Sequence, residues 1–127
     1  ALQMPRTEVV FFKDHENSVP VLDWLDGLPR KVQNKCYVKV ERLEELGHEL
    51  RRPEADLLEQ GIYELRIGYR GVNYRILYAF HEKEAVLLHG LVKEKVVRET
   101  DLNIAISRLN VFRNDPKSHT YSEMASD

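Results

Sequence analysis

The chain has 127 residues, of which 43% are hydrophobic and 31% are charged, and its formal net charge is −2. This length predicts one domain with a single core of ordinary size and leaves no room for a second domain. No apolar run approaches the length needed to span a bilayer, and the first residues do not resemble a signal peptide, so we expect a cytoplasmic protein without membrane contact. The negative net charge argues against tight independent binding of RNA.

The first part of the chain predicts a strand and then a short helix. Glu8 to Lys13 is a run of β-branched and aromatic residues, which is typical of a strand that pairs into the main sheet. A short amphipathic helix follows and ends near Gly27. Asn17 or Ser18 is its expected N-cap, and Pro20 suits its first turn.

A longer helix and a connection come next. The helix begins at Pro29, shows apolar residues at three- and four-residue spacing, and ends at Gly47. With the short helix it is expected to form a hairpin over the sheet. The segment His48 to Gln60 contains Pro53 and mixed charges, and we interpret it as a connection with one irregular turn.

The middle of the chain predicts a β-hairpin. Apolar residues alternate along two runs that flank the tight connection Gly68 to Gly71. If Ile67 stands near Val72 across this turn, Arg66 and Arg75 project from the same face. The opposite face carries the aromatic and branched side chains. These are Tyr63, Leu65, Ile67, Tyr74, Ile76, Tyr78 and Phe80.

The last part of the chain predicts a central strand, a helix and a tail. The run Ala85 to Val92 is almost wholly apolar, which indicates a central strand. Thr100 or Asp101 is expected to cap a last helix with one apolar side. After Asp115 we expect a mobile tail, about 115–127, behind an ordered core of about 8–113. The whole predicts a single α+β domain over 1–127, with helices packed around a largely antiparallel sheet.

Several short motifs resemble a known family of bacterial toxins. The strings GIYELR at 61–66, YRILY at 74–78 and LLHGLVKEK at 87–95 are similar to the core of the phage-derived branch of HigB-type toxins, within the RelE/ParE superfamily. Upstream, VPVLDWLDGLP at 19–29 and the Leu58-x-x-Gly61 approach resemble the leading part of that family, and Thr100 to Arg108 resembles its final helix. The resemblance covers roughly residues 8 to 113. It implies a RelE-like fold with two N-terminal helices and one C-terminal helix on the sheet.

The resemblance also implies an activity and partners. Many toxins of this superfamily, from type II toxin–antitoxin modules, cut mRNA on the ribosome without a metal and so arrest translation and growth. The 2′-OH attacks the neighbouring phosphate, so the protein must orient the RNA, neutralise charge on the phosphoryl oxygens and help protons move. The implied partners are the ribosome, mRNA and a helix-turn-helix antitoxin, through which the complex would bind operator DNA. No cofactor is implied.

Two arginines match basic positions of the family and are the first catalytic candidates. Arg66 and Arg75 on one open sheet face would form a clamp for a phosphate. The alternative is a structural salt bridge, because Glu64 would stand directly across from Arg75 in the assumed register.

Basic residues after the third strand are further candidates. Lys93 is a candidate catalytic residue, and Lys95 and Arg98 are candidate RNA contacts. The resemblance implies these roles, because the family carries a basic pair at this place, followed by Lys-Thr-Pro. This chain departs from that pattern, since Glu94 interrupts the pair and Val96 to Thr100 stands in place of the signature. Either lysine can equally be a solvated charge at a strand end.

A histidine and a turn tyrosine complete the candidate site. His89 is a candidate general acid or base because its ordinary pKa lies near neutrality, although a hydrogen-bonded core histidine is the common outcome within an apolar strand. Tyr69 in the turn is a candidate for stacking on an RNA base, and its neighbour Arg70 is a candidate RNA contact. The alternative is that Tyr69 only covers local backbone.

The sequence carries no sign of a metal or nucleotide site. Cys36 is the single cysteine and falls on an apolar helix face, which indicates a buried structural thiol. His15, His48, His81 and His119 are dispersed without ligand spacing. No glycine-rich phosphate loop or nucleophile elbow is present. We therefore expect neither a metal nor a cofactor.

Three functions stay open at this point. The region 61–98 has seven basic and four acidic residues, which favours RNA over the sheet only weakly. A ribosome-dependent endoribonuclease is the leading hypothesis. A ParE-like toxin that inhibits DNA gyrase by protein contact would share the fold without the chemistry. A degenerate module that only binds the antitoxin would fit the missing Lys-Thr-Pro and the net charge.

Overall fold

The computed structural model describes residues 6–123, which form one six-stranded sheet and three α-helices. The strands are β1 (Glu8–Phe12), β2 (Ala55–Glu59), β3 (Ile62–Tyr69), β4 (Val72–His81), β5 (Glu84–Lys93) and β6 (Thr120–Tyr121), and the helices are α1 (Pro20–Asp26), α2 (Arg30–Leu46) and α3 (Glu99–Asn114). The strand order is β2-β3-β4-β5-β1-β6. β1 runs parallel to β5, and the other neighbouring pairs are antiparallel. The predicted α+β class, the mostly antiparallel sheet and the central place of β5 are confirmed.

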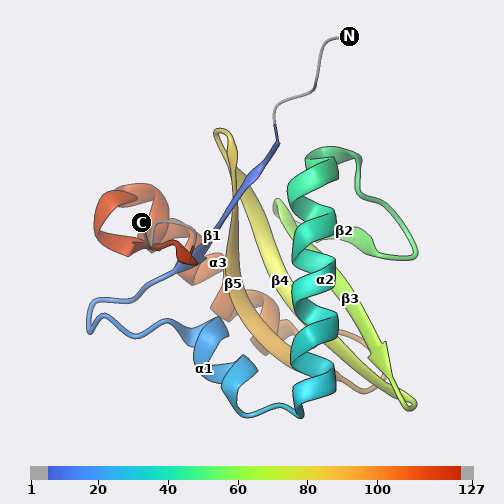
Figure 1. Cartoon of the computed structure of the whole chain (residues 1–127). Helices are drawn as coiled ribbons and strands as arrows, with labels where there is room; N and C mark the ends of the chain where they lie inside the picture. The colour runs from blue at the N-terminus through green and yellow to red at the C-terminus, as the bar shows by residue number, and fades with distance from the viewer. Residues whose placement is uncertain (1–5, 124–127) are drawn as a thin grey trace, which may run out of the picture.

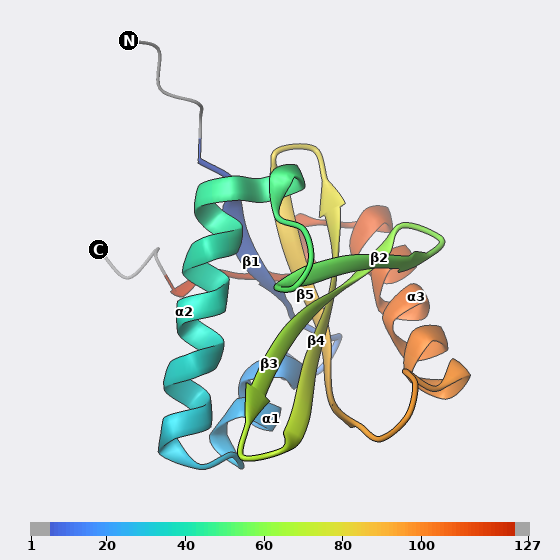
Figure 2. The ribbon, with the colours of Figure 1, turned by 90° about the vertical axis from the view of Figure 1, so that its right-hand side faces the viewer.

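The sheet is the middle layer of three. Figures 1 and 2 show α1 and α2 on one side of it and α3 on the other. α1 lies against β5 so closely that a Cβ on Gly90 would fall 2.2 Å from the Trp24 ring, so the contact needs glycine. Cys36 of α2 is fully buried, as predicted, and burial raises the pKa of its thiol to about 12.

α3 covers part of the opposite sheet face with the apolar side that its spacing predicts. Ala105, Leu109 and Phe112 are buried against β1, β4 and β5. The sheet side chains in this second core include Val10, Leu77, Ala79, Val86, Leu88 and Leu91. The sheet therefore has apolar cover on both faces.

The β3–β4 hairpin has a two-residue turn of the type that matches strand twist. Arg70 and Gly71 have φ values of 49° and 78°, as the central residues of a type I′ turn require. Tyr69 pairs with Val72, so Ile67 stands opposite Tyr74 and not near Val72. The true register is thus shifted by two residues from the assumed one. An even shift preserves the faces, which is why the shared face of the two arginines was still predicted correctly.

The predicted N-cap of the first helix is wrong. α1 begins after Val19, which has extended backbone and makes no side-chain cap bond. The preceding turn is organised by Asp14, whose Oδ1 accepts bonds from the backbone N–H groups of Glu16 and Ser18 at 2.9 Å. Asn17 lies in the left-handed region with φ 66°. Polar residues before a helix can thus build a turn in place of a cap.

The predicted N-cap of the last helix is also wrong. α3 begins at Glu99 after Arg98, so Thr100 and Asp101 lie within its first turn. Asp101 is not available as a cap because it contacts His89 of β5. The predicted end of α2 is confirmed, since Gly47 follows its last residue, Leu46, with φ 53°.

Two segments carry more structure than the sequence predicts. The segment interpreted as a connection contains β2, which pairs with β3 and buries Ala55. The expected mobile tail contains a 3-10 turn at Lys117–His119 and then β6, which pairs with β1. His119 is buried there, stacks on Phe12 and binds the Lys13 carbonyl at 2.7 Å. The end of that expected tail, 124–127, lies outside the described residues.

Candidate functional site

Cross-strand pairing brings four of the predicted site residues onto one face of the sheet. Residues directly opposite one another in neighbouring strands project from the same face. From the hairpin turn inward, the rows are Gly68, Asn73 and Lys93; then Arg66, Arg75 and Leu91; then Glu64, Leu77 and His89. The arrangement brings the two arginines into one row, with Lys93 and His89 in the rows on either side.

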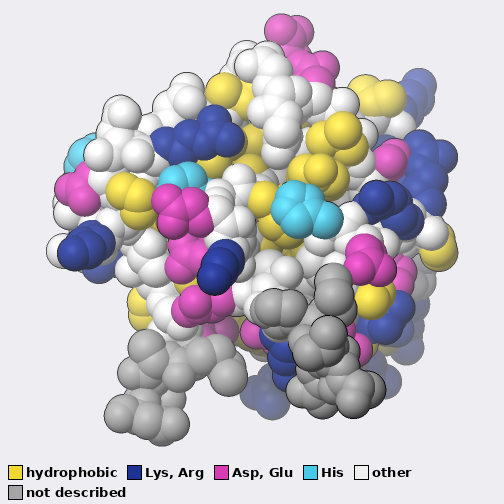
Figure 3. All heavy atoms as spheres, turned by 90° about the horizontal axis from the view of Figure 1, so that it is seen from above, with side chains coloured by type: hydrophobic (Ala, Val, Ile, Leu, Met, Phe, Trp, Pro, Cys, Tyr) yellow, Lys and Arg dark blue, Asp and Glu magenta, His cyan; other side chains and the backbone are white. Residues whose placement is uncertain are grey.

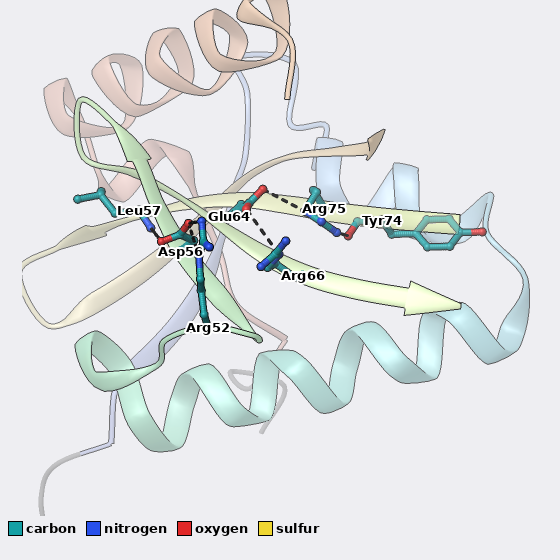
Figure 4. Close-up of polar contacts among 7 residues, drawn as sticks. All are labelled: Arg52, Asp56, Leu57, Glu64, Arg66, Tyr74 and Arg75. Atoms are coloured by element: carbon teal, nitrogen blue, oxygen red, sulfur yellow. Dashed lines mark hydrogen bonds and ion pairs between the residues drawn. The ribbon is translucent and has the colours of Figure 1, made fainter. Parts of the chain in front are cut away.

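Arg75 is held in a buried ion pair. The residue is 4% exposed and Glu64 is 5% exposed. Arg75 Nε donates to Glu64 Oε1 at 3.1 Å, and its Nη1 donates to the Tyr74 carbonyl at 3.0 Å (Figure 4). Burial lowers the pKa of Arg75, and the Glu64 charge opposes that shift. Glu64 reaches Arg75 diagonally, because its direct cross-strand partner is Leu77.

Arg66 is the open member of this group. Its side chain is 28% exposed, and its Nε lies 3.6 Å from Glu64 Oε2, which is too far for a hydrogen bond. We call Glu64, Arg66 and Arg75 the arginine cluster. One carboxylate serves two guanidiniums, so the cluster keeps one positive charge, and that charge is accessible at Arg66. The open face expected for both arginines is present for Arg66 but not for Arg75.

His89 has a carboxylate and a guanidinium as partners. Its Nε2 lies 2.8 Å from Asp101 Oδ1, and Arg108 Nη1 lies 3.3 Å from its Nδ1. Arg108 Nη1 also donates to the Leu88 carbonyl at 2.8 Å. A guanidinium can only donate, so Nδ1 is the acceptor and Nε2–H donates to Asp101. We call His89, Asp101 and Arg108 the histidine cluster, and in it both ring nitrogens are occupied.

The remaining basic candidates lie around the start of α3. Lys93 ends β5 and is half-buried, whereas Lys95 and Arg98 are exposed in the connection to α3. Arg98 Nε approaches Asp101 Oδ2 to 3.5 Å, and this buried oxygen has no hydrogen-bond partner among the described residues. Lys95, Arg98 and Asp101 line one small hollow of about 180 Å³. The sequence did not indicate Asp101 or Arg108, because their roles arise from the approach of α3 to β5.

Tyr69 and Arg70 are separated from the other candidates. Tyr69 packs against the core under α1 and α2, which is the face opposite to Arg66. The Arg70 guanidinium lies 5.2 Å from the centre of the Tyr69 ring, and the Lys35 ammonium lies 5.8 Å from it. The ring therefore covers local structure at the turn, as the alternative interpretation predicts.

A basic hollow beside β3 was not predicted. It has a volume of about 620 Å³ and is lined from α2 by Lys35, Val38 and Lys39. The facing wall is formed by Pro53, Arg66, Ile67, Gly68, Asn73 and Arg75. We call it the β3-edge hollow, and Figure 4 shows Arg66 between β3 and α2. The four-residue spacing of the lysines was visible in the sequence, but their position along β3 depends on tertiary packing.

A second hollow, of about 740 Å³, lies between β1 and α2, but its charged lining is mostly acidic, with Glu8, Glu41, Glu44 and Glu123 beside Arg6. Within residues 6–123, no group of three histidine, cysteine or acidic side chains is placed to hold a metal ion. No helix in this range is long and apolar enough to cross a membrane. Figure 3 shows acidic, basic and hydrophobic side chains mixed on the end of the molecule seen from above.

Comparison with known families gives one match. Residues 23–110 match the family described as phage derived protein Gp49-like (DUF891), a RelE/toxin-like family. The match extends from α1 into α3 and includes both the arginine cluster and the histidine cluster. No curated protein matches the chain. Because the match covers more than half of the 127 residues, the chain belongs to the Gp49-like family of phage-derived proteins, which is consistent with a toxin of a toxin–antitoxin module.

Proposed function

We propose that the protein is a HigB-type toxin that cuts ribosome-bound mRNA without a metal and thereby arrests translation. The observation that carries this proposal is the arginine cluster, where a buried Glu64–Arg75 pair supports a partly exposed Arg66 beside the β3-edge hollow. A cation fixed on a rigid strand stabilises charge that develops on a phosphoryl oxygen. Strand placement favours the precise geometry that such a contact needs.

The reaction is an internal transfer at one phosphate. The ribose 2′-hydroxyl gives up its proton as its oxygen bonds to phosphorus, the bond to the 5′-oxygen breaks, and that oxygen takes up a proton, so the products are a 2′,3′-cyclic phosphate and a 5′-hydroxyl. Arg66 would contact the phosphoryl oxygens, with Lys93 in the neighbouring row as a second contact. Arg75 is too buried for direct contact in this arrangement and would position Arg66 through Glu64.

The proton-transfer group is His89 in this proposal. Its Nδ1 accepts from Arg108, so it would take up a proton only after that contact opens. Lys95, Arg98 and Arg70 are exposed and would contribute charge along the RNA path. Tyr69 would stack on a base only if it left its packing against α2.

The proposed partners follow from membership of a toxin-like family. A toxin of this class requires a neutralising antitoxin, for which we propose a helix-turn-helix protein that also carries the complex to operator DNA. The site of action would be the ribosome, in the cytoplasm. Retention of catalysis without Lys-Thr-Pro is part of the proposal, because Lys93 and Arg66 would supply the basic groups.

A second candidate is a toxin that acts by protein contact, as in ParE-like inhibition of DNA gyrase. It is favoured by the buried state of Arg75 and by the occupation of both His89 nitrogens. Both features describe polar groups that already have partners and leave fewer free for chemistry. A degenerate module that only binds antitoxin would share them.

Inducible expression in bacteria separates these candidates. We expect growth arrest together with new mRNA 5′ ends that depend on active translation, and unchanged plasmid supercoiling. Growth arrest with altered supercoiling and intact mRNA would favour the gyrase inhibitor. Normal growth with stable, folded protein would leave the degenerate module.

A further inference from the structure

A polar hollow lies where the segment after β1 meets the end of α3 and the turn before β6. Its volume is about 360 Å³, and its lining residues fall within 14–17 and 111–119. Figure 1 shows the segment after β1 and the end of α3 on the same side of the molecule. We call this space the α3-end hollow. All of its lining residues lie outside 23–110, so it is built by segments beyond the match to the Gp49-like family.

His119 is a buried histidine with one free ring nitrogen, and it lines this hollow. The residue is 4% exposed and stacks on Phe12. Its Nδ1 lies 2.7 Å from the Lys13 carbonyl, and a carbonyl only accepts, so Nδ1 carries the proton. In the neutral ring Nε2 is then an acceptor, and no described residue donates to it.

The free nitrogen of His119 is open to the hollow. Among the described residues, Asp101 Oδ2 is the one fully enclosed side-chain polar atom without a hydrogen-bond partner. His119 Nε2 also has no partner, so it is reached from outside the packed protein. Buried polar groups are normally paired, and an acceptor that is fixed on its other side and open to a hollow is available to a ligand.

The α3-end hollow carries negative charge without a matching cation. Asp14 and Asp115 line it, and neither has a basic nitrogen within 4 Å in the described part of the chain. Arg113 and Lys117 flank Asp115 in the sequence but do not line the hollow. The carbonyl end of α3 adds partial negative charge.

Both carboxylates are held in place by neighbouring donors. Asp14 Oδ1 accepts from the N–H groups of Glu16 and Ser18, which leaves Oδ2 open. Asp115 Oδ2 accepts from the Ser118 hydroxyl at 2.7 Å. This bond is the largest cause that holds the pKa of Asp115 below its ordinary value of 3.8, so the carboxylate is charged at neutral pH.

These groups select the chemistry of a ligand. A neutral imidazole nitrogen and two carboxylates all accept hydrogen bonds, so a complementary ligand is a cation with several donors. Within residues 6–123 no three side chains are placed to hold a metal ion. The exposed ring of His15 stands edge-on to His119, with ring centres 4.7 Å apart, and offers a flat wall. A planar guanidinium has five donors and stacks on such rings, whereas an ammonium has three donors and no flat face.

We propose that the α3-end hollow binds a guanidinium group. The guanidinium donates to His119 Nε2 and to the Asp115 carboxylate, and it stacks on the His15 ring. Asp14 adds a second negative charge at the same hollow. The guanidinium belongs either to an arginine side chain of a partner protein or to a free arginine-like molecule. The site goes beyond the proposed function and holds whether or not the protein cleaves RNA.

Nuclear magnetic resonance of the full chain tests this site with defined probes. The probe is arginine blocked at both ends, and blocked citrulline is its neutral comparison, because it has nearly the same shape without the charge. We expect blocked arginine to shift the His119 Nε2 signal and the amide signals of residues 14–17 and 115–119, with a dissociation constant of about 1 mM. Blocked citrulline should shift neither. Tighter binding of free arginine would identify a small molecule as the source of the guanidinium, and tighter binding of the blocked form a protein side chain; either result supports the site.

A matched pair of variants tests the contribution of charge. Asp115→Asn removes the charge beside the hollow and keeps an acceptor for Ser118, and it should weaken binding of blocked arginine about fivefold. Asp26→Asn makes the same change at the end of α1, outside the hollow, and should leave the affinity unchanged. Both aspartates are exposed, so both variants should fold.

Three results would overturn the proposal. The first is no change in the His119 signals with blocked arginine at about 10 mM, a concentration that detects even weak binding. The second is a proton on His119 Nε2 in the free protein, which would leave no imidazole acceptor facing the hollow. The third is equal binding of arginine and citrulline, or binding of zinc chloride at the two histidines without binding of arginine. These readouts measure ligand binding and not cleavage, so they fail independently of the proposed function.

Discussion

The arginine cluster and the histidine cluster meet on one sheet face, where Glu64 and His89 share a row, yet they differ in how their charges are satisfied. In the histidine cluster, each ring nitrogen of His89 has a partner from α3. In the arginine cluster, Glu64 serves both Arg75 and Arg66, and only Arg75 is close enough for a hydrogen bond. The arginine cluster therefore keeps an accessible cation, whereas the histidine cluster does not offer a free ring nitrogen.

The difference follows from the length and position of α3. Its first turn and its middle deliver Asp101 and Arg108 to β5, whereas Arg66 lies on β3, two strands away from β5. Polar side chains that are covered by a helix and hydrogen-bonded to it have mainly a structural role. A cation beside a buried ion pair, such as Arg66 beside Glu64 and Arg75, can be held in position and still be accessible to a ligand. This is why the proposed chemistry centres on Arg66.

The largest expected effect is the loss of the buried carboxylate. Glu64→Ala would leave Arg75 buried without its counter-charge and should lower the free energy of unfolding by about 3–5 kcal/mol, measured by urea denaturation. The double variant Glu64→Leu with Arg75→Met removes both charges and should lose much less. A loss below about 1 kcal/mol for Glu64→Ala would mean that the pair is not buried as described.

A smaller effect is expected at the histidine cluster. Asp101→Ala would leave the His89 Nε2–H without its acceptor and should cost about 1–3 kcal/mol of stability. Asp101→Asn keeps an acceptor oxygen and should cost less. Thermal unfolding of the two variants checks this order. Equal losses would point to the charge at the start of α3 and not to the hydrogen bond.

The smallest stability effect is expected at the rim of the hollow and should depend on pH. Hydrogen bonds from Arg42 and Lys39 hold the pKa of Glu54 below its ordinary value of 4.5. A depressed pKa contributes stability above the unfolded value, and that contribution is lost as pH falls through the folded value. Glu54→Gln should therefore flatten the fall in stability between about pH 5 and pH 3.

The comparison variant for this pH effect is Arg42→Gln. It removes the Arg42 hydrogen bond, which is the largest cause of the depressed pKa of Glu54, and should reproduce most of the flattening of the pH profile. Adding Glu54→Gln to Arg42→Gln should then change the pH profile little. An undiminished further change would show that the acid sensitivity attributed to this contact has another source.

The sequence predicted strand faces well and burial depth poorly. Alternation along β3 and β4 placed Arg66 and Arg75 together even with the register assumed two residues out, because period-two patterns survive an even shift. Alternation does not say how deeply each residue is covered. Arg75 at 4% exposure and Arg66 at 28% side-chain exposure have the same pattern. The salt-bridge alternative identified Glu64 correctly as the partner.

Features made by distant segments were missed for one physical reason. Asp101 has the composition of an N-cap, and its contact with His89 depends on how α3 meets β5. β2 was missed because its sequence ADLLE follows Pro53 and has no β-branched or aromatic residue, whereas β1, of equal length, reads EVVFF. Lys35 and Lys39 face β3 only because α2 runs along its edge. Sequence patterns predict local secondary structure, whereas the β3-edge hollow is formed by the tertiary packing of α2 beside β3.

The central claim is that Arg66 is the accessible cation of an RNA-cleaving site. The direct measurement is the rate of mRNA cleavage by purified Arg66→Ala in a reconstituted translation reaction, beside Arg52→Ala as the matched control. Arg52 is exposed, pairs with Asp56 and does not line the hollow. The proposal predicts that Arg66→Ala folds normally and cuts about a hundredfold more slowly, while Arg52→Ala cuts at the wild-type rate. Cleavage at the wild-type rate by folded Arg66→Ala would contradict it.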